Sequence, residues 1–147
     1  MASPETFTTH SEQDTFALGE TVAATLRPGT FVLLHGDLGA GKTAFVRGLA
    51  AGLGANPDDV SSPTFVLIQH YTGRTPLVHV DLYRLDLGAA IDDLGLEELA
   101  SEAVVAIEWA ERLPRKLEGS VTVTIDDLGN DTRRITIEPE IGTRNLF

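Results

Sequence analysis

The sequence feature that most restricts the fold is a run of eight residues that matches the phosphate-loop pattern G-x-x-x-x-G-K-[ST] at every fixed position. The apolar run before it, Thr30 to His35, is typical of a short strand buried on both faces. The segment after it, Lys42 to Leu53, repeats apolar residues at helical spacing. A strand, a glycine loop and a helix in this order predict a phosphate-binding α/β domain. The loop residues are Gly36, Asp37, Leu38, Gly39, Ala40, Gly41, Lys42 and Thr43.

The chemistry expected of this loop follows from its place between a strand and a helix. Glycines let the backbone wrap so that its N–H groups point at phosphate oxygens, and the start of the helix adds the positive end of its dipole. We expect the Lys42 ammonium to neutralise the β- and γ-phosphates and the Thr43 hydroxyl to bind Mg²⁺. Ala44 stands where many such loops carry a second hydroxyl, so this position offers no hydroxyl to the α-phosphate.

Before the loop, the chain predicts one strand and one helix. Glu5 to Thr9 reads as a short extended piece, and Ser11 with Asp14 forms a helix start that resembles a capping box. The helix should continue to Arg27-Pro28-Gly29, where proline and glycine end it. The residues expected on its inward face are Phe16, Gly19, Ala23 and Leu26.

After the loop helix, the pattern predicts two hairpins with a helix and a buried strand between them. The strands of the first hairpin are Thr64 to Tyr71 and Leu77 to Asp81; an acidic helix over Ala89 to Ala100 and a strand over Ala103 to Glu108 follow. In the second hairpin a turn-rich Asp126 to Asp131 joins Val121–Ile125 to Arg133–Ile137. The expected fold is a three-layer α/β fold of the P-loop NTPase type, with a central mixed sheet that is parallel at its centre and has antiparallel hairpins at the side.

Size, charge and cysteine content narrow the class of protein. A chain of 147 residues suits one domain over residues 1–147, with no apolar run long enough to cross a membrane and no secretory start, so we expect a cytoplasmic protein. Zero cysteines and no helical histidine pair favour Mg²⁺ over Zn²⁺. A net charge of -11 repels a phosphate backbone, so for any contact with nucleic acid either a partner would supply most of the basic surface or the few arginines would be clustered.

Two apolar strands end in a carboxylate. Leu77 to Asp81 and Val104 to Glu108 each deliver one acid at the carboxyl end of a strand. In an open α/β sheet these ends line the ligand crevice, and a P-loop needs such an acid near its Mg²⁺. The pattern therefore predicts that Asp81 and Glu108 face the nucleotide, without deciding which of them holds the metal.

Further motifs resemble the TsaE family, whose members were once called YjeE. Besides the phosphate loop they are Ser62-Pro63-Thr64-Phe65, Val80 to Leu85, Leu94 to Glu98 and Ile107 to Arg112, in the family's order over nearly the whole chain. The resemblance implies an ATPase, weak alone, that acts with TsaB and TsaD to form threonylcarbamoyladenosine beside the anticodon of tRNAs. The tRNA would then be reached only through the complex.

The same resemblance assigns roles to individual residues. It implies that Thr43 and Glu108 are the Mg²⁺ ligands, that Asp81 is an acid needed for hydrolysis, and that Trp109 lies beside the site. It also implies a switch-like loop at Ser62, Pro63 and Thr64 and an adenine-side wall at Ser11 and Glu12. Arg133 and Arg134 lie on the last hairpin, where we expect one of them, taken here as Arg133, to contact nucleotide or partner.

Other classes of P-loop protein are the alternatives to an ATPase subunit of this family. A small-molecule kinase shares the loop and the length, but its lid usually carries arginines, and Leu85 to Ala103 contains no Arg or Lys. A GTPase is disfavoured because no Asn-Lys-x-Asp motif for guanine occurs. A third alternative is a nucleotide-dependent scaffold that docks on partners and hydrolyses ATP only to return to its starting state. This hypothesis overlaps with that of an ATPase subunit.

Overall fold

The computed structural model describes residues 4–36, 41–60, 68–82, 95–110, 113, 117 and 120–138. Within these ranges the strands form one seven-stranded sheet in the order β1-β7-β6-β2-β5-β4-β3. The centre, from β6 through β2 and β5 to β4, is parallel, whereas the pairs β1 with β7, β6 with β7 and β3 with β4 are antiparallel. This confirms the predicted mixed sheet. The strands are β1 Glu5–Thr9, β2 Phe31–His35, β3 Ile68–Tyr71, β4 Leu77–Asp81, β5 Val104–Glu108, β6 Val121–Gly129 and β7 Thr132–Glu138.

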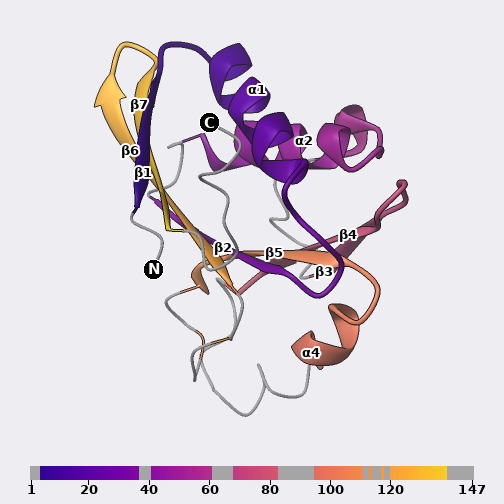
Figure 1. The fold of residues 1–147 in the computed structure, drawn as a ribbon. Coiled ribbons are helices and arrows are strands. Elements are labelled where there is room, and N and C mark those ends of the chain that lie inside the picture. The colour runs from indigo at the N-terminus through magenta and orange to yellow at the C-terminus, as the bar shows by residue number, and fades with distance from the viewer. Residues whose placement is uncertain are drawn as a thin grey trace.

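Helices lie on both faces of this sheet. Figure 1 shows α1 (Glu12–Ala23) and α2 (Lys42–Gly52) on one side and the short α4 (Leu96–Leu99) on the other. A single turn of 3-10 helix, η1 (Pro57–Asp59), follows α2. The predicted helix over Ala89 to Ala100 is described only from residue 95 onward, and the first part of the predicted strand Thr64 to Tyr71 also lies outside the described residues.

Alternation along the strands sorts the core into two apolar clusters. Successive side chains of a strand point to opposite faces, so Val32 and Leu34 of β2 pack under α1 and α2, whereas Phe31 and Leu33 belong to the cluster on the α4 side. By the same alternation, His79 of β4 and Glu108 of β5 fall on the α1 and α2 face. This face also receives the start of α2, which carries the phosphate-loop lysine.

The first helix begins where the sequence predicted. The Ser11 hydroxyl accepts a hydrogen bond from the backbone N–H of Asp14 at 3.0 Å, and the Asp14 carboxylate accepts one from the N–H of His10 at 3.0 Å. The inward face differs from the prediction at two residues: Phe16 is only half-buried, and Leu26, although buried, lies beyond the helix, which ends at Ala23. The buried residues of this helix are Thr15, Leu18, Gly19, Val22 and Ala23.

Glycines allow α1 and α2 to cross in close contact. A Cβ atom placed on Gly48 would lie 2.1 Å from the carbonyl oxygen of Phe16, and one placed on Gly19 would lie 2.4 Å from that of Phe45. Both neighbours are backbone atoms of the facing helix and cannot move aside alone. The spacing of the two helices is therefore set by the absence of side chains here.

We expect Gly48→Ala to destabilise the fold by about 3 kcal/mol, because overpacking a helix contact outweighs the ~1 kcal/mol that alanine gains in helix propensity. Chemical denaturation measures the change. Gly129→Ala is the matched control, since its added methyl meets nothing within 4 Å and only its backbone φ of 89° is strained. Equal losses in the two variants would show that the helix crossing is not tight.

The second hairpin is longer than predicted. The expected turn over Asp126 to Asp131 is wrong in extent, because β6 continues to Gly129 and only Asn130 and Asp131 form the turn, with φ of 55° and 64°. Asp and Gly are poor strand residues, which is why the sequence suggested a loop. Cross-strand charge pairs offset that preference: Asp127 pairs with Arg133 at 2.9 Å and Asp126 with Arg134 at 3.6 Å.

The described helices are all too short or too polar to cross a membrane.

Candidate active site

Three strands of the α/β core, β2, β4 and β5, end at the edge of the sheet where α2 begins. β2 ends at His35, directly before Gly36, and α2 starts at Lys42. In the parallel centre, Leu34 of β2 is in register with Glu108 of β5, which is in register with Asp81 of β4. The two acids predicted from the strand pattern therefore lie side by side on neighbouring strands, and Glu108 faces Lys42, the first residue of the loop helix.

Lys42 is buried among partners within the chain. Its side chain is only 6% exposed, and its ammonium donates to the carbonyl oxygen of Gly36 at 2.8 Å. The same nitrogen lies 3.9 Å from Oε1 of Glu108 and 4.9 Å from the ring centre of Trp109. A carbonyl, a carboxylate and an aromatic face thus hold the ammonium at the edge of the sheet.

Glu108 is the second buried charge of this edge. It is 7% exposed in a strand whose other residues are all buried. Its Oε2 lies 2.6 Å from Nε2 of His79, and its Oε1 faces Lys42. A buried carboxylate has to be paired or hydrogen-bonded, and Glu108 has both kinds of partner.

Trp109 follows Glu108 in a backbone conformation that is uncommon for a residue with a side chain. Its φ is 59°, although it is not a glycine. This turn takes the chain out of β5 and leaves the half-buried indole facing the Lys42 ammonium. Such conformations persist only where surrounding structure fixes them, and they are found preferentially at functional sites.

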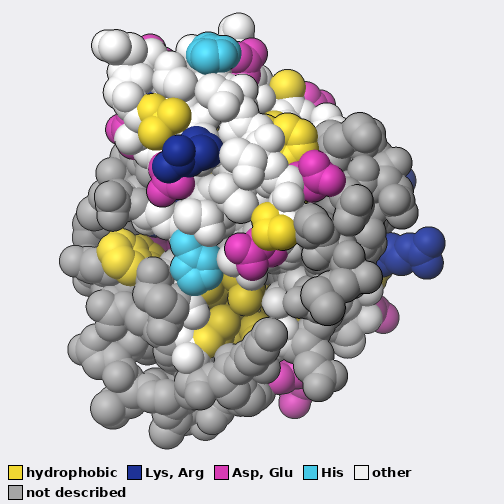
Figure 2. Space-filling model, turned by 60° about the vertical axis from the view of Figure 1, so that its left-hand side comes forward, with side chains coloured by type: hydrophobic (Ala, Val, Ile, Leu, Met, Phe, Trp, Pro, Cys, Tyr) yellow, Lys and Arg dark blue, Asp and Glu magenta, His cyan; other side chains and the backbone are white. Residues whose placement is uncertain are grey.

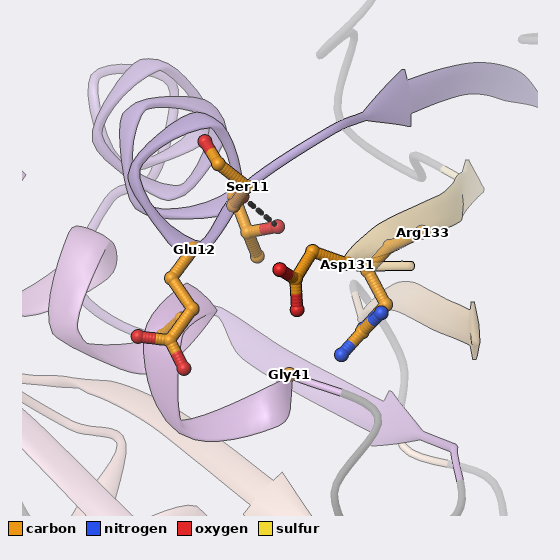
Figure 3. Close-up of a pocket in the computed structure, with 7 residues that line it drawn as sticks. Ser11, Glu12, Gly41, Asp131 and Arg133 are labelled. Carbon is orange, nitrogen blue, oxygen red and sulfur yellow. Dashed lines mark hydrogen bonds between the residues drawn. The ribbon is translucent and has the colours of Figure 1, made fainter. Parts of the chain in front are cut away.

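A pocket lies beside Gly41, at the start of α2. It contains about 290 Å³ of space, part of it open to solvent, between the start of α1, the start of α2 and the β6-β7 turn. Figure 3 shows the Arg133 side chain directed toward Gly41, with Asp131 between Arg133 and Ser11. The lining residues are Ser11, Glu12, Thr15, Gly41, Ala44, Asp131 and Arg133.

This pocket brings together predicted residues that are far apart in the sequence. Ser11, Gly41 and Arg133 come from three different elements and line one space. Gly41 has a φ of 105°, which favours glycine, and a Cβ atom there would lie in ordinary contact with Arg133, 3.5 Å from its Nε. Arg134, the next residue, is instead 53% exposed beside Asp126.

Thr43 is half-buried in the first turn of α2, and Asp81 is half-buried at the end of β4. Asp37, Leu38, Gly39 and Ala40 of the loop, and Ser62, Pro63 and Thr64 of the predicted switch, lie outside the described residues.

His79 contacts Glu108 of the candidate site, although the sequence pattern did not single it out. Its signal was present, because Leu77, His79 and Asp81 alternate along one face of an apolar strand that ends at the site. A histidine inside such a strand is usually a core residue, and only the contact with Glu108 distinguishes it here.

Comparison with known proteins decides the family. A family model described as threonylcarbamoyl adenosine biosynthesis protein TsaE matches residues 9–135. The chain belongs to the TsaE family. This confirms the resemblance inferred from the motifs, and the matched range includes both the phosphate loop and the carboxylates of this TsaE chain.

Individual TsaE relatives match over most of their length. A tRNA threonylcarbamoyladenosine biosynthesis protein TsaE of Treponema pallidum is 43% identical over 129 residues, covering 86% of this chain and 95% of the relative. The protein of that name from Bacillus subtilis is 40% identical over 131 residues, covering 87% and 81%. The crystal structure of Bacillus subtilis YdiB superposes with a TM-score of 0.73 at 34% identity, covering 98% of this chain and 90% of that one.

Proposed function

We propose that this TsaE family member is a single-domain, Mg-dependent ATPase subunit that acts with TsaB and TsaD in the cytoplasm. Its task is the threonylcarbamoyladenosine modification of the adenosine next to the anticodon in tRNA. The observation that carries the proposal is the buried pair of Lys42 and Glu108, with 3.9 Å between ammonium and carboxylate. The lysine belongs to a complete phosphate-loop pattern, and the glutamate ends the neighbouring strand β5.

The residues at the sheet edge fit a magnesium nucleotide. Mg²⁺ prefers oxygen ligands and takes only one or two from the protein when phosphates supply others. Thr43 and Glu108 would hold it, and when bound it would neutralise charge on the phosphates. The pocket beside Gly41, lined by Ser11 and Arg133, lies next to the loop, where we expect the base or the sugar to make contact.

The chain's own groups then have distinct tasks. Lys42 brings a buried positive charge to the phosphates, where a low local dielectric strengthens its attraction. Asp81, which is in register with Glu108, would orient a water for attack on the terminal phosphate. The role of Ser62, Pro63 and Thr64 in sensing the phosphates stays a prediction from the family resemblance.

Surface charge supports indirect rather than direct contact with tRNA. The chain carries 22 acidic against 11 basic residues. On the face in Figure 2, acidic side chains are spread among the described residues and Lys or Arg side chains are few. A surface of this kind does not attract a phosphate backbone, so the partner subunits would supply most of that contact.

The decisive experiment measures heat on mixing Mg-ATP with the protein, and ATP turnover with and without TsaB and TsaD. We expect binding by the isolated chain and turnover that rises when both partners are present. No heat under either condition would refute the proposal. Transfer of phosphate to a small acceptor without tRNA would instead identify a P-loop kinase.

The pocket gives a separate prediction. We expect Arg133→Ala to weaken Mg-ATP binding about tenfold, because it removes a cation that lines the space beside Gly41, and one charge-assisted hydrogen bond is worth roughly 1.5 kcal/mol. Arg134→Ala is the matched control, since it makes the same change at the neighbouring, exposed position. Calorimetric titration compares the two, and equal affinities would remove Arg133 from the site.

A further inference from the structure

A fully buried histidine lies beside the carboxylate of the candidate site. His79 is 0% exposed in the middle of β4, on the face that otherwise packs apolar side chains under α1 and α2. Its partner in the register of the sheet is Ala106 of β5. Ala106 precedes Glu108 by two residues, so both point to the same face as His79. An imidazole in such a place costs free energy unless a hydrogen bond compensates its desolvation.

That hydrogen bond goes to Glu108. Nε2 of His79 lies 2.6 Å from Oε2 of Glu108, while Nδ1 has no hydrogen-bond partner in the described part of the chain. An ionised carboxylate can only accept a hydrogen bond, so in a contact with the ionised form of Glu108 we expect Nε2 of the imidazole to be the donor. The contact with Glu108 is thus the polar interaction that accounts for a histidine at this position.

The two carboxylate oxygens of Glu108 face partners from different elements. Oε2 is bonded to His79 of β4, and Oε1 faces Lys42 of α2 at 3.9 Å. The shorter and better defined of these contacts is the one with His79. Without it, the carboxyl group could rotate about its last bond, because the distance to Lys42 is too long for a hydrogen bond.

We propose that His79 is a positioning residue that fixes the carboxylate of Glu108 in the orientation needed to bind Mg²⁺. The inference rests on the proposed function, in which Glu108 holds the metal. His79 itself touches neither metal nor nucleotide. Carboxylates that bind metals are held by hydrogen bonds from such outer partners, and loss of one typically costs 10- to 100-fold in metal affinity.

Three substitutions separate hydrogen bonding from packing. His79→Leu removes the hydrogen-bond donor and fills the position with an apolar side chain of moderate size. His79→Gln keeps an N–H near the position of Nε2, whereas His79→Asn carries its amide near Nδ1 and cannot reach Glu108. If the leucine variant does not fold, the two amide variants still decide between the explanations.

Binding of Mg²⁺ and of ATP is measured through the fluorescence of Trp109. This residue is the only tryptophan of the sequence, and the centre of its ring lies 4.9 Å from the Lys42 ammonium. Mg²⁺ is titrated into each variant at fixed ATP, and ATP is titrated separately in EDTA. We expect the Leu and Asn variants to need at least about tenfold more Mg²⁺ for half-saturation. The Gln variant should stay within about threefold of wild type, and all should bind ATP alike in EDTA.

Several results would overturn the inference. Leu and Asn variants with the Mg²⁺ requirement of wild type would show that Glu108 needs no support from His79. A Gln variant as impaired as the Asn variant would assign the effect to packing. Failure of wild type to bind Mg-ATP at all would instead refute the proposed function, so the two failures are distinct.

A measurement on the unmodified protein avoids the question of folding. Nitrogen NMR of histidine-labelled wild type reports which ring nitrogen of His79 carries the proton, without metal or nucleotide. A proton on Nε2 is expected from the bond to Glu108. A proton on Nδ1 alone would mean that Nε2 accepts from Glu108, and it would overturn the proposed role.

Discussion

Lys42→Ala is expected to abolish measurable Mg-ATP binding, with a loss of at least about 100-fold in affinity, or ~2.8 kcal/mol. The ammonium it removes is buried at the carboxyl end of β2 and is already held in place by Gly36 and Glu108. A positive charge preorganised in this way interacts with phosphate more strongly than one in water. The variant would also leave Glu108 without its cation, which adds repulsion toward the phosphates.

The control for this variant is Arg27→Ala, which removes the same charge at an exposed position before β2, at the opposite edge of the sheet. Calorimetry with Mg-ATP compares the two, and circular dichroism checks that both are folded. Binding by the Lys42 variant at the strength of wild type would exclude this lysine from the site.

Glu108→Gln is expected to lower Mg-dependent ATP hydrolysis at least about 100-fold, by removing a charge that would hold the metal and stabilise the transition state. The amide has the shape of the carboxyl group, so packing around His79 and Lys42 should be preserved. ATP binding in EDTA should be equal to or tighter than that of wild type, because a negative charge beside the phosphates is gone. Glu108→Ala should lose hydrolysis in the same way.

Phosphate release over a series of Mg²⁺ concentrations measures the first effect, and Trp109 fluorescence in EDTA the second. Glu102→Gln serves as the control, since Glu102 is exposed just before the other end of the same strand. Hydrolysis unchanged in the Glu108 variant would leave Asp81 as the acid on which the metal depends.

Local pattern was sufficient for much of the fold and of the site. The strands ending at Asp81 and Glu108 and the helix starting at Lys42 lie where apolar spacing predicted them. Their convergence also followed, because parallel strands of one sheet deliver their carboxyl ends to the same edge. The Ser11 cap was equally predictable, since it depends on residues within one helical turn.

The second hairpin shows where local pattern fails. Asp126, Asp127 and Gly129 have weak strand preferences, yet they continue β6, because its pairing with β7 extends to Gly129. Arg133 and Arg134 of β7 stand opposite the two aspartates. A cross-strand pair depends on register, and register depends on how the whole sheet is assembled. Propensity summed along one segment carries none of that information.

By itself, the sequence determined the chemistry available at the loop and the edge of the sheet where it would be used. A glycine pattern, a lysine, a hydroxyl and two strand-end acids are contiguous signals, and the family followed from their order. Tertiary structure alone decided that His79 supports Glu108, and that Ser11, Gly41 and Arg133 share one pocket. Those contacts join residues from separate elements, and their distances are fixed only when strands are in register and helices are packed.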